Sequence, residues 1–412
     1  MRRLVTVSIV CSLLCVLDSL CDASPVSAGQ PIQVQASTHS LMFGQEVRFH
    51  LQVAAPDPIR SIVLAYRTSD NPGTIVETMA FDQGMTVTID YVHRVKERYI
   101  RPFVQVTYWW TIDSMADARL TTEPQTFAYA DNRFDWQTLS QSVVTIHWYR
   151  GDMRVAQKAL DAAITGLDRA RQDININATR QPIDVYLYES ADDMQAALPA
   201  GTPTGTEALT LYETSVILAA SGLQEANVLD LQRILPHEVT HALVHEATQS
   251  DFDSVPLWLS EGLATSVQYT FAPDPDAQLL MEEAARDQTL ISLDTLCAAF
   301  PQSPARARLA YAESASVIGY IRDRYGRRAL RDLVAAYGDG ATCEGGVQRV
   351  LSLSLDRLQA QWTQSLAPQS GWRTFWKDSG AWAILLVLSL LIVVPFVIPV
   401  RGRMARPKDG NP

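Results

Sequence analysis

Positive charge is scarce in this sequence. It has 34 lysine and arginine residues against 45 aspartate and glutamate residues, which gives a formal net charge of −11. The middle of the chain also lacks any cluster of basic residues. Proteins that bind nucleic acids need a basic surface to match the phosphate backbone. The composition therefore argues against nucleic acid, or any other polyanion, as a partner.

Cysteine is rare as well, and its placement indicates where the protein is used. There are 5 cysteines, three of which fall within residues 1–28. That segment begins Met1-Arg2-Arg3, continues with an apolar stretch and ends in small residues, as secretory signals do. Once a signal peptide at 1–28 is removed, Cys297 and Cys343 remain, and we expect them to form a disulfide in an oxidising compartment.

The other end of the chain has the features of a membrane anchor. Residues 380–400 form a run without charge, which is long enough to cross a bilayer as a helix. Tryptophans precede this run, and basic residues follow it in 401–412. Aromatic residues mark a membrane interface and basic residues the cytoplasmic side. We therefore expect a juxtamembrane linker at 367–379, one transmembrane helix and a short cytoplasmic tail. We thus expect a type I cell-membrane protein with its bulk outside the cytoplasm.

A length of 412 residues suggests at least two domains between these ends. Within residues 29–130, apolar residues such as Val47, Phe49 and Leu51 alternate with polar ones. Turn signals such as Asn71-Pro72-Gly73 separate the runs. About seven short strands in roughly 100 residues predict an all-β sandwich of immunoglobulin type.

Residues 131–366 show strand patterns first and helical patterns later, which predicts an α+β domain. Strands are predicted at 143–149, 183–188 and 215–220, and an early helix at 152–172. Beyond Tyr269 the pattern is mostly helical. The strand at 215–220 leads into the helix discussed next. We expect this strand to lie along a cleft as an edge for an extended peptide.

The stretch Leu235–Ala247 contains His237, Glu238 and His241 in the order His-Glu-x-x-His. Residues four apart lie on one face of a helix, so both imidazoles can reach one metal ion while Glu238 stands beside them. The other interpretation is a helix with two hydrogen-bonded histidines and a solvent-facing glutamate. The secretory signal and Glu261 make that interpretation the weaker one.

Glu261 is the candidate third ligand, since it is the one carboxylate in the apolar segment Pro256–Ala264. No histidine follows His245, so a third ligand downstream must be a carboxylate. Asp251 and Asp253 are further candidates in the expected loop, ranked below Glu261. Four residues beyond His241, His245 is turned about 40° further round the helix, so we expect it to be structural or to support the ligands. Three protein ligands and one open position suit a catalytic Zn²⁺.

The segment around Glu261 also suggests how it packs. Its expected core residues are Leu257, Trp258, Leu259 and Leu263. Gly262 and Ala264 are small, and we expect them to let this segment approach the motif helix closely around a metal.

These motifs resemble those of the gluzincin metallopeptidases, whose third zinc ligand is a glutamate on the following helix. More narrowly, the chain is similar to bacterial proteins with a peptidase MA-like domain, and Tyr311–Gly326 resembles a later helix of that group. The resemblance covers about residues 130–365. It implies a zinc ion bound by His237, His241 and Glu261, with Glu238 as the catalytic base.

Two further features of aminopeptidase-type gluzincins can be compared with this chain. Those enzymes hold the substrate's amino end with a Gly-x-Met-Glu-Asn stretch, which is absent here, and this argues against exopeptidase activity. They also stabilise the negatively charged oxygen that forms during hydrolysis with a tyrosine beyond the third ligand. Tyr311 is the candidate for that role, and a packed helix residue is the other interpretation.

The sequence thus predicts a membrane-anchored, extracytoplasmic zinc peptidase that hydrolyses a peptide or protein substrate. The alternative is a non-catalytic, membrane-tethered binding or envelope-assembly protein that keeps the same fold. The presence or absence of a cleft at the metal site distinguishes the two.

Overall fold

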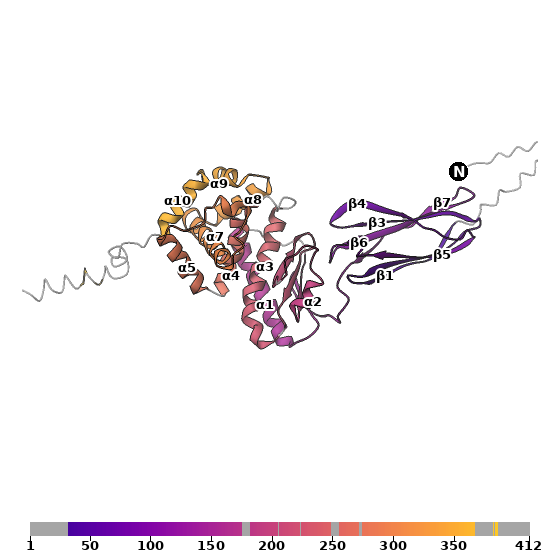
Figure 1. Cartoon of the computed structure of the whole chain (residues 1–412), viewed down its shortest axis with the longest axis horizontal. Helices are drawn as coiled ribbons and strands as arrows, with labels where there is room; N and C mark the ends of the chain where they lie inside the picture. The colour runs from indigo at the N-terminus through magenta and orange to yellow at the C-terminus, as the bar shows by residue number, and fades with distance from the viewer. Residues whose placement is uncertain are drawn as a thin grey trace, which may run out of the picture. The chain divides into compact units, whose positions relative to one another are not determined.

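The structure is a computed structural model, and it describes residues 32–174, 182–204, 206–222, 224–248, 255–271, 274–366, 382, 384 and 385. The chain divides into two compact units at Tyr129, with Arg101–Phe103 belonging to the second unit (Figure 1). The expected signal peptide lies outside the described residues. So does the expected membrane span at 380–400, apart from residues 382, 384 and 385. No helix in the described ranges is long and apolar enough to cross a membrane.

The first unit is β-rich, as predicted. Its strands are β1 (Gln33–Met42), β2 (Glu46–Ala54), β3 (Ile59–Thr68), β4 (Asn71–Thr78), β5 (Thr86–Arg94), β6 (Gln105–Ser114), β7 (Arg119–Thr121) and β8 (Gln125–Ala128). One sheet has the order β1-β2-β5, and the other has the order β4-β3-β6-β7 with β8 paired to β6. All pairings are antiparallel.

Period-two patterning is what makes these two sheets pack face to face. In β2, Val47, Phe49 and Leu51 are buried and alternate with less buried polar residues. The ring of Phe49 lies 5.8 Å from that of Tyr66 and 5.0 Å from that of Tyr108, which belong to the opposite sheet. Alternating apolar side chains thus meet in one shared core. The immunoglobulin type stays a prediction.

One turn signal in this unit was misplaced. Asn71-Pro72-Gly73 does not separate two strands but opens β4, because Thr68 already pairs with Asn71 across the hairpin. The turn itself falls on Ser69 and Asp70. β4 is an edge strand, with β3 as its one neighbour in the sheet, and an edge strand tolerates a proline because one side of its backbone needs no partner.

The second unit begins with a mixed sheet of order β12-β13-β11-β10-β9. Its strands are β9 (Gln137–Gln141), β10 (Val144–Trp148), β11 (Ile183–Tyr188), β12 (Ala208–Leu211) and β13 (Val216–Ala220). The three predicted strands are β10, β11 and β13, which run parallel. The expectation that the strand at 215–220 forms the edge is wrong, because β13 pairs with β12 on its outer side.

Helices make up the rest of this unit, and Figure 1 shows the later ones gathered in one bundle. They are α1 (Met153–Ile174), α2 (Ala191–Gln195), α3 (Val228–Thr248), α4 (Leu257–Phe271), α5 (Pro275–Arg286), α6 (Thr295–Ala298), α7 (Pro304–Tyr325), α8 (Arg327–Gly338), α9 (Cys343–Leu351) and α10 (Leu355–Leu366). Two short 3₁₀ turns, Tyr212–Thr214 and Glu225–Asn227, flank β13.

Two glycines fix where the central helices cross. A Cβ on Gly166 of α1 would lie 2.5 Å from the Cα of Pro236 in α3, so α1 and α3 touch next to the motif. A Cβ on Gly262 of α4 would lie 2.7 Å from the carbonyl oxygen of Ser314 in α7. Gly262 therefore brings α4 against α7, and the expectation that it serves the contact with the motif helix is corrected.

The predicted packing around Glu261 is otherwise close to the structure. Trp258, Leu259 and Leu263 are buried, whereas Leu257 is partly exposed because it opens α4. The predicted disulfide between Cys297 and Cys343 is confirmed. It joins the short helix α6 to the start of α9, and so ties the segment after α5 to the end of the bundle.

Candidate metal centre

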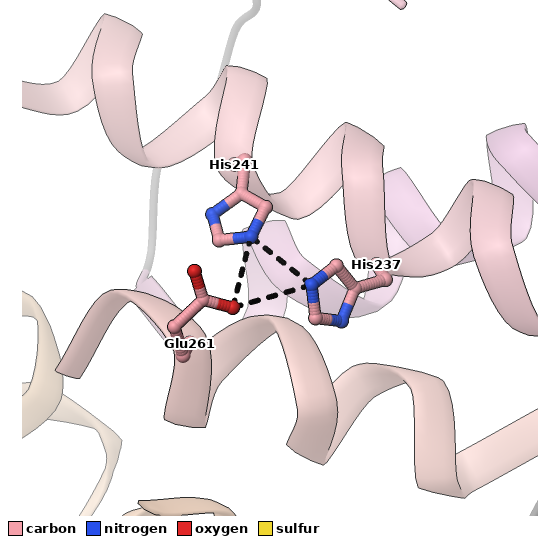
Figure 2. Close-up of side chains that lie close together, drawn as sticks. All are labelled: His237, His241 and Glu261. Carbon is pink, nitrogen blue, oxygen red and sulfur yellow. Dashed lines mark hydrogen bonds and ion pairs between the residues drawn. The ribbon is translucent and has the colours of Figure 1, made fainter. Parts of the chain in front are cut away.

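The structure brings together the three residues predicted as metal ligands. His237 and His241 project from α3, and Glu261 projects from α4 toward them (Figure 2). The two Nε2 atoms lie 3.1 Å apart. Glu261 Oε2 lies 3.4 Å from each of them. One turn of helix separates the histidines, so both side chains lie on the same face of α3, and the neighbouring helix supplies the carboxylate.

This donor set fits a zinc ion. Ligand atoms bound to zinc at about 2.0–2.2 Å in a tetrahedron lie about 3.3–3.5 Å from one another, and the observed separations are 3.1, 3.4 and 3.4 Å. Glu261 Oε2 is buried and has no hydrogen-bond partner among the described residues. A cation between the three atoms would give Glu261 Oε2 a partner. The fourth tetrahedral position around that cation would stay open.

The electrostatics of the three side chains agree with a site for positive charge. Burial acts to raise the pKa of Glu261, but the two imidazoles hold it well below its usual range. Burial acts to lower the pKa of His241, but the Glu261 carboxylate outweighs it and the net shift is upward. The partly buried carboxylate is thus stabilised by a neighbouring positive charge, which either a proton on an imidazole or a metal ion can supply.

Ser260 orients one of the imidazoles, a contact that the sequence did not predict. Its Oγ lies 3.1 Å from Nδ1 of His241, and both side chains are buried. A hydrogen bond from the Nδ1–H of His241 to Ser260 leaves the lone pair on Nε2 free to face a metal. Nδ1 of His237 is buried and has no partner within the described ranges.

Glu238 lies beside this group without joining it. Its Oε2 accepts a hydrogen bond of 2.6 Å from Oγ1 of Thr210 on β12. The same hydroxyl lies 3.1 Å from the backbone oxygen of Glu238. Thr210 is buried. The sequence did not indicate this partner, because the strand that carries it has only four residues.

A cleft of about 500 Å³ opens at one of the three candidate ligands, His237. His237 and Glu238 line it from α3, Tyr311 lines it from α7, and Ala208 lines it from β12. The strand that reaches the cleft is therefore β12, and not β13 as predicted. Charged residues on the walls occur in pairs, with Arg233 bound to Glu207 and Arg308 bound to Asp274.

Tyr311 lies near the metal group but does not join it. Its ring centre is 6.4 Å from that of His237 and 5.0 Å from that of Phe300. Burial, with the charges of Glu261 and Glu238, raises the pKa of Tyr311 to about 12. The hydroxyl therefore keeps its proton at neutral pH and can act as a hydrogen-bond donor.

The other candidates from the sequence lie elsewhere. The ring of His245 stacks on that of Tyr212, with their centres 5.4 Å apart, and His245 is not part of the ligand group. Asp251 and Asp253 lie outside the described residues. Among the described residues, His237, His241 and Glu261 form the one such group that could hold a metal ion.

A His-Glu-x-x-His helix followed by a glutamate on the next helix forms a candidate metal centre with the ligand arrangement of the gluzincin type. Comparison with protein families identifies the superfamily of the chain. The model of the Peptidase MA superfamily matches residues 162–368, which is half of the chain. The chain therefore belongs to the Peptidase MA superfamily. No curated relative matches it.

Comparison with solved structures also gives matches, two of which are given as similarities only. Native yeast LTA4 hydrolase is 9% identical with a TM-score of 0.34, over 79% of this chain and 64% of that one. Aminopeptidase A of Legionella pneumophila is 11% identical with a TM-score of 0.34, over 81% of this chain and 49% of that one. The chain thus spans less than two thirds of either structure.

Proposed function

We propose that the protein is a membrane-anchored, extracytoplasmic, zinc-dependent peptidase. One observation carries the proposal. Three donor atoms from His237, His241 and Glu261 lie within 4.8 Å of one another, and His237 lines a cleft together with Glu238. A protein that had kept only the fold would not need a base beside a ligand set at an open cleft.

The chain's own residues account for the proton transfers of peptide hydrolysis. A zinc ion, when bound, would polarise the scissile carbonyl and make water more acidic. Oε2 of Glu238 is held by Thr210, so Oε1 is the oxygen left to take a proton from the attacking water. The water oxygen bonds to the carbonyl carbon, the C–N bond breaks, and Glu238 passes the proton to the leaving amine.

Two further elements have roles in the proposal. Tyr311 would donate a hydrogen bond to the negative charge that develops on the carbonyl oxygen, since its hydroxyl stays protonated at neutral pH. The outer edge of β12 would bind an extended stretch of a peptide or protein substrate through backbone hydrogen bonds.

The proposed location outside the cytoplasm has separate support. The Cys297–Cys343 disulfide suits an oxidising compartment. The uncharged run at 380–400, followed by basic residues, suits a single C-terminal membrane helix.

A variant set tests the proposed activity. The full-length chain, purified with zinc, should cleave members of a peptide library, and Glu238→Gln should abolish cleavage while keeping the metal. Glu246→Gln is the matched control, because Glu246 lies on the same helix and is not among the residues that line the cleft. A Glu238→Gln variant with full activity would show that another group is the base, and a zinc-loaded wild type that cleaves nothing would disprove the proposed activity.

A further inference from the structure

Thr210 makes an unusual contact for a residue in a four-residue strand. It lies in β12 with 3% of its surface exposed. Its Oγ1 is 2.6 Å from Oε2 of Glu238 and 3.1 Å from the backbone oxygen of the same residue. A hydroxyl has one proton to donate. The carboxylate is both the nearer acceptor and the charged one, so it takes the stronger hydrogen bond.

We infer that Thr210 is a positioning residue that holds the carboxylate of Glu238 in the orientation required for proton transfer. The inference rests on the proposed function. A glutamate side chain has three rotatable bonds, so without a fixed partner its carboxylate can adopt several orientations in an open cleft. The hydroxyl of Thr210 selects one of them and occupies Oε2, which directs Oε1 to the reacting atoms.

The contact also joins two walls of the site. Ala208, two residues before Thr210, lines the same cleft. The strand that would bind the peptide therefore also holds the base that acts on it. The placement of Glu238 relative to substrate then depends on β12 as well as on α3.

A different role for Thr210 would be purely structural, with its hydroxyl only tying β12 to α3. The two roles predict different results for Thr210→Val, which keeps the shape of the side chain and removes the hydroxyl. If the role is structural, Thr210→Val lowers the free energy of unfolding and leaves kcat unchanged. A positioning role lowers kcat in the folded, zinc-loaded enzyme.

The test compares Thr210→Val, Thr210→Ser and Thr248→Val in the full-length chain with zinc. Thr248 is the matched control, because it is also 3% exposed and its hydroxyl donates to backbone oxygens of α3, away from the cleft. We expect kcat to fall about 10- to 100-fold in Thr210→Val, since a hydrogen bond to a charged group is lost. KM and zinc content should stay unchanged. Thr210→Ser should restore most of kcat, and Thr248→Val should keep all of it.

The inference would be overturned if Thr210→Val kept the kcat of wild type, or if Thr248→Val lost as much kcat as Thr210→Val. Either result would leave the peptidase proposal intact. Crystal structures of wild type and Thr210→Val decide the matter independently of activity. We expect the Glu238 carboxylate to leave its wild-type position in Thr210→Val. An unchanged carboxylate would overturn the inference even if the protein cleaved no peptide.

Discussion

Glu313 is a buried carboxylate close to the proposed site, and it predicts a measurable dependence of stability on pH. It lies on α7, two residues after Tyr311, with no exposed surface. The backbone N–H of Ile291 is 3.1 Å from each of its carboxylate oxygens. Burial raises the pKa of Glu313 to about 7, against the opposing effects of this hydrogen bond and the charge of Arg306.

The sign of the effect follows from proton linkage. The unfolded chain releases the Glu313 proton near pH 4.5, whereas the folded protein keeps it to about pH 7. Between these values the folded state binds more protons, so its stability falls as pH rises. A pKa difference of about 2.5 corresponds to about 3 kcal/mol, because each pKa unit is worth about 1.4 kcal/mol. This stabilisation is complete below pH 4.5 and is lost above about pH 7.

Glu313→Gln isolates this contribution, because glutamine can still accept the hydrogen bond from Ile291 and does not titrate. Urea unfolding of the second unit would be followed for both proteins from pH 4.5 to 8, with chelator present so that metal binding does not contribute. As the pH rises from 4.5 to 8, the free energy of unfolding of the variant should increase by about 3 kcal/mol relative to that of wild type. A difference between the two proteins that stays constant with pH would refute the reasoning.

Three further substitutions follow from contacts in the same unit. Ser260→Ala removes the acceptor of the His241 ring and should weaken zinc affinity about 10- to 100-fold, as read by competition with a chelator. Gly262→Ala places a Cβ 2.7 Å from the backbone of α7 and should lower the free energy of unfolding by about 1–3 kcal/mol; an unchanged urea midpoint would contradict this. Cys343→Ser removes the Cys297–Cys343 disulfide, which closes a loop between residues 46 positions apart. It should lower the free energy of unfolding, measured with heat or urea, by about 4 kcal/mol.

Sequence spacing was enough to predict the core of the site. His237 and His241 lie one helical turn apart, so any helix that contains both brings their rings together. Glu261 could be chosen because it is the one carboxylate in an apolar segment, where burial needs a compensating charge. The disulfide followed from counting cysteines, since only two remain after residue 28.

Contacts between distant segments could not be predicted in the same way. Thr210 and Ser260 are short polar residues of a kind that is common in loops and caps, and nothing near them in the sequence marks their partners. β12 is short and ends in a tight turn before β13, so its pattern was too brief to indicate a strand. As a result, β13 was expected to be the edge of the sheet.

The glycine in the second motif shows a similar limit. A small residue next to a ligand indicates that something approaches closely, but it does not say which element does so. Gly262 was expected to face the motif helix, and in the structure it faces α7. Consecutive residues on a helix point in directions about 100° apart. Glu261 and Gly262 therefore face different helices.

In the proposed enzyme, His237, His241 and Glu261 bind one zinc ion. Anomalous diffraction at the zinc absorption edge, from crystals of the full-length chain grown with zinc, tests this most directly. We expect a single strong peak about 2.0–2.2 Å from both Nε2 atoms and from a Glu261 carboxylate oxygen, and we expect Glu261→Ala to lose it. A peak held by other residues, or none at this position, would contradict the proposed metal site.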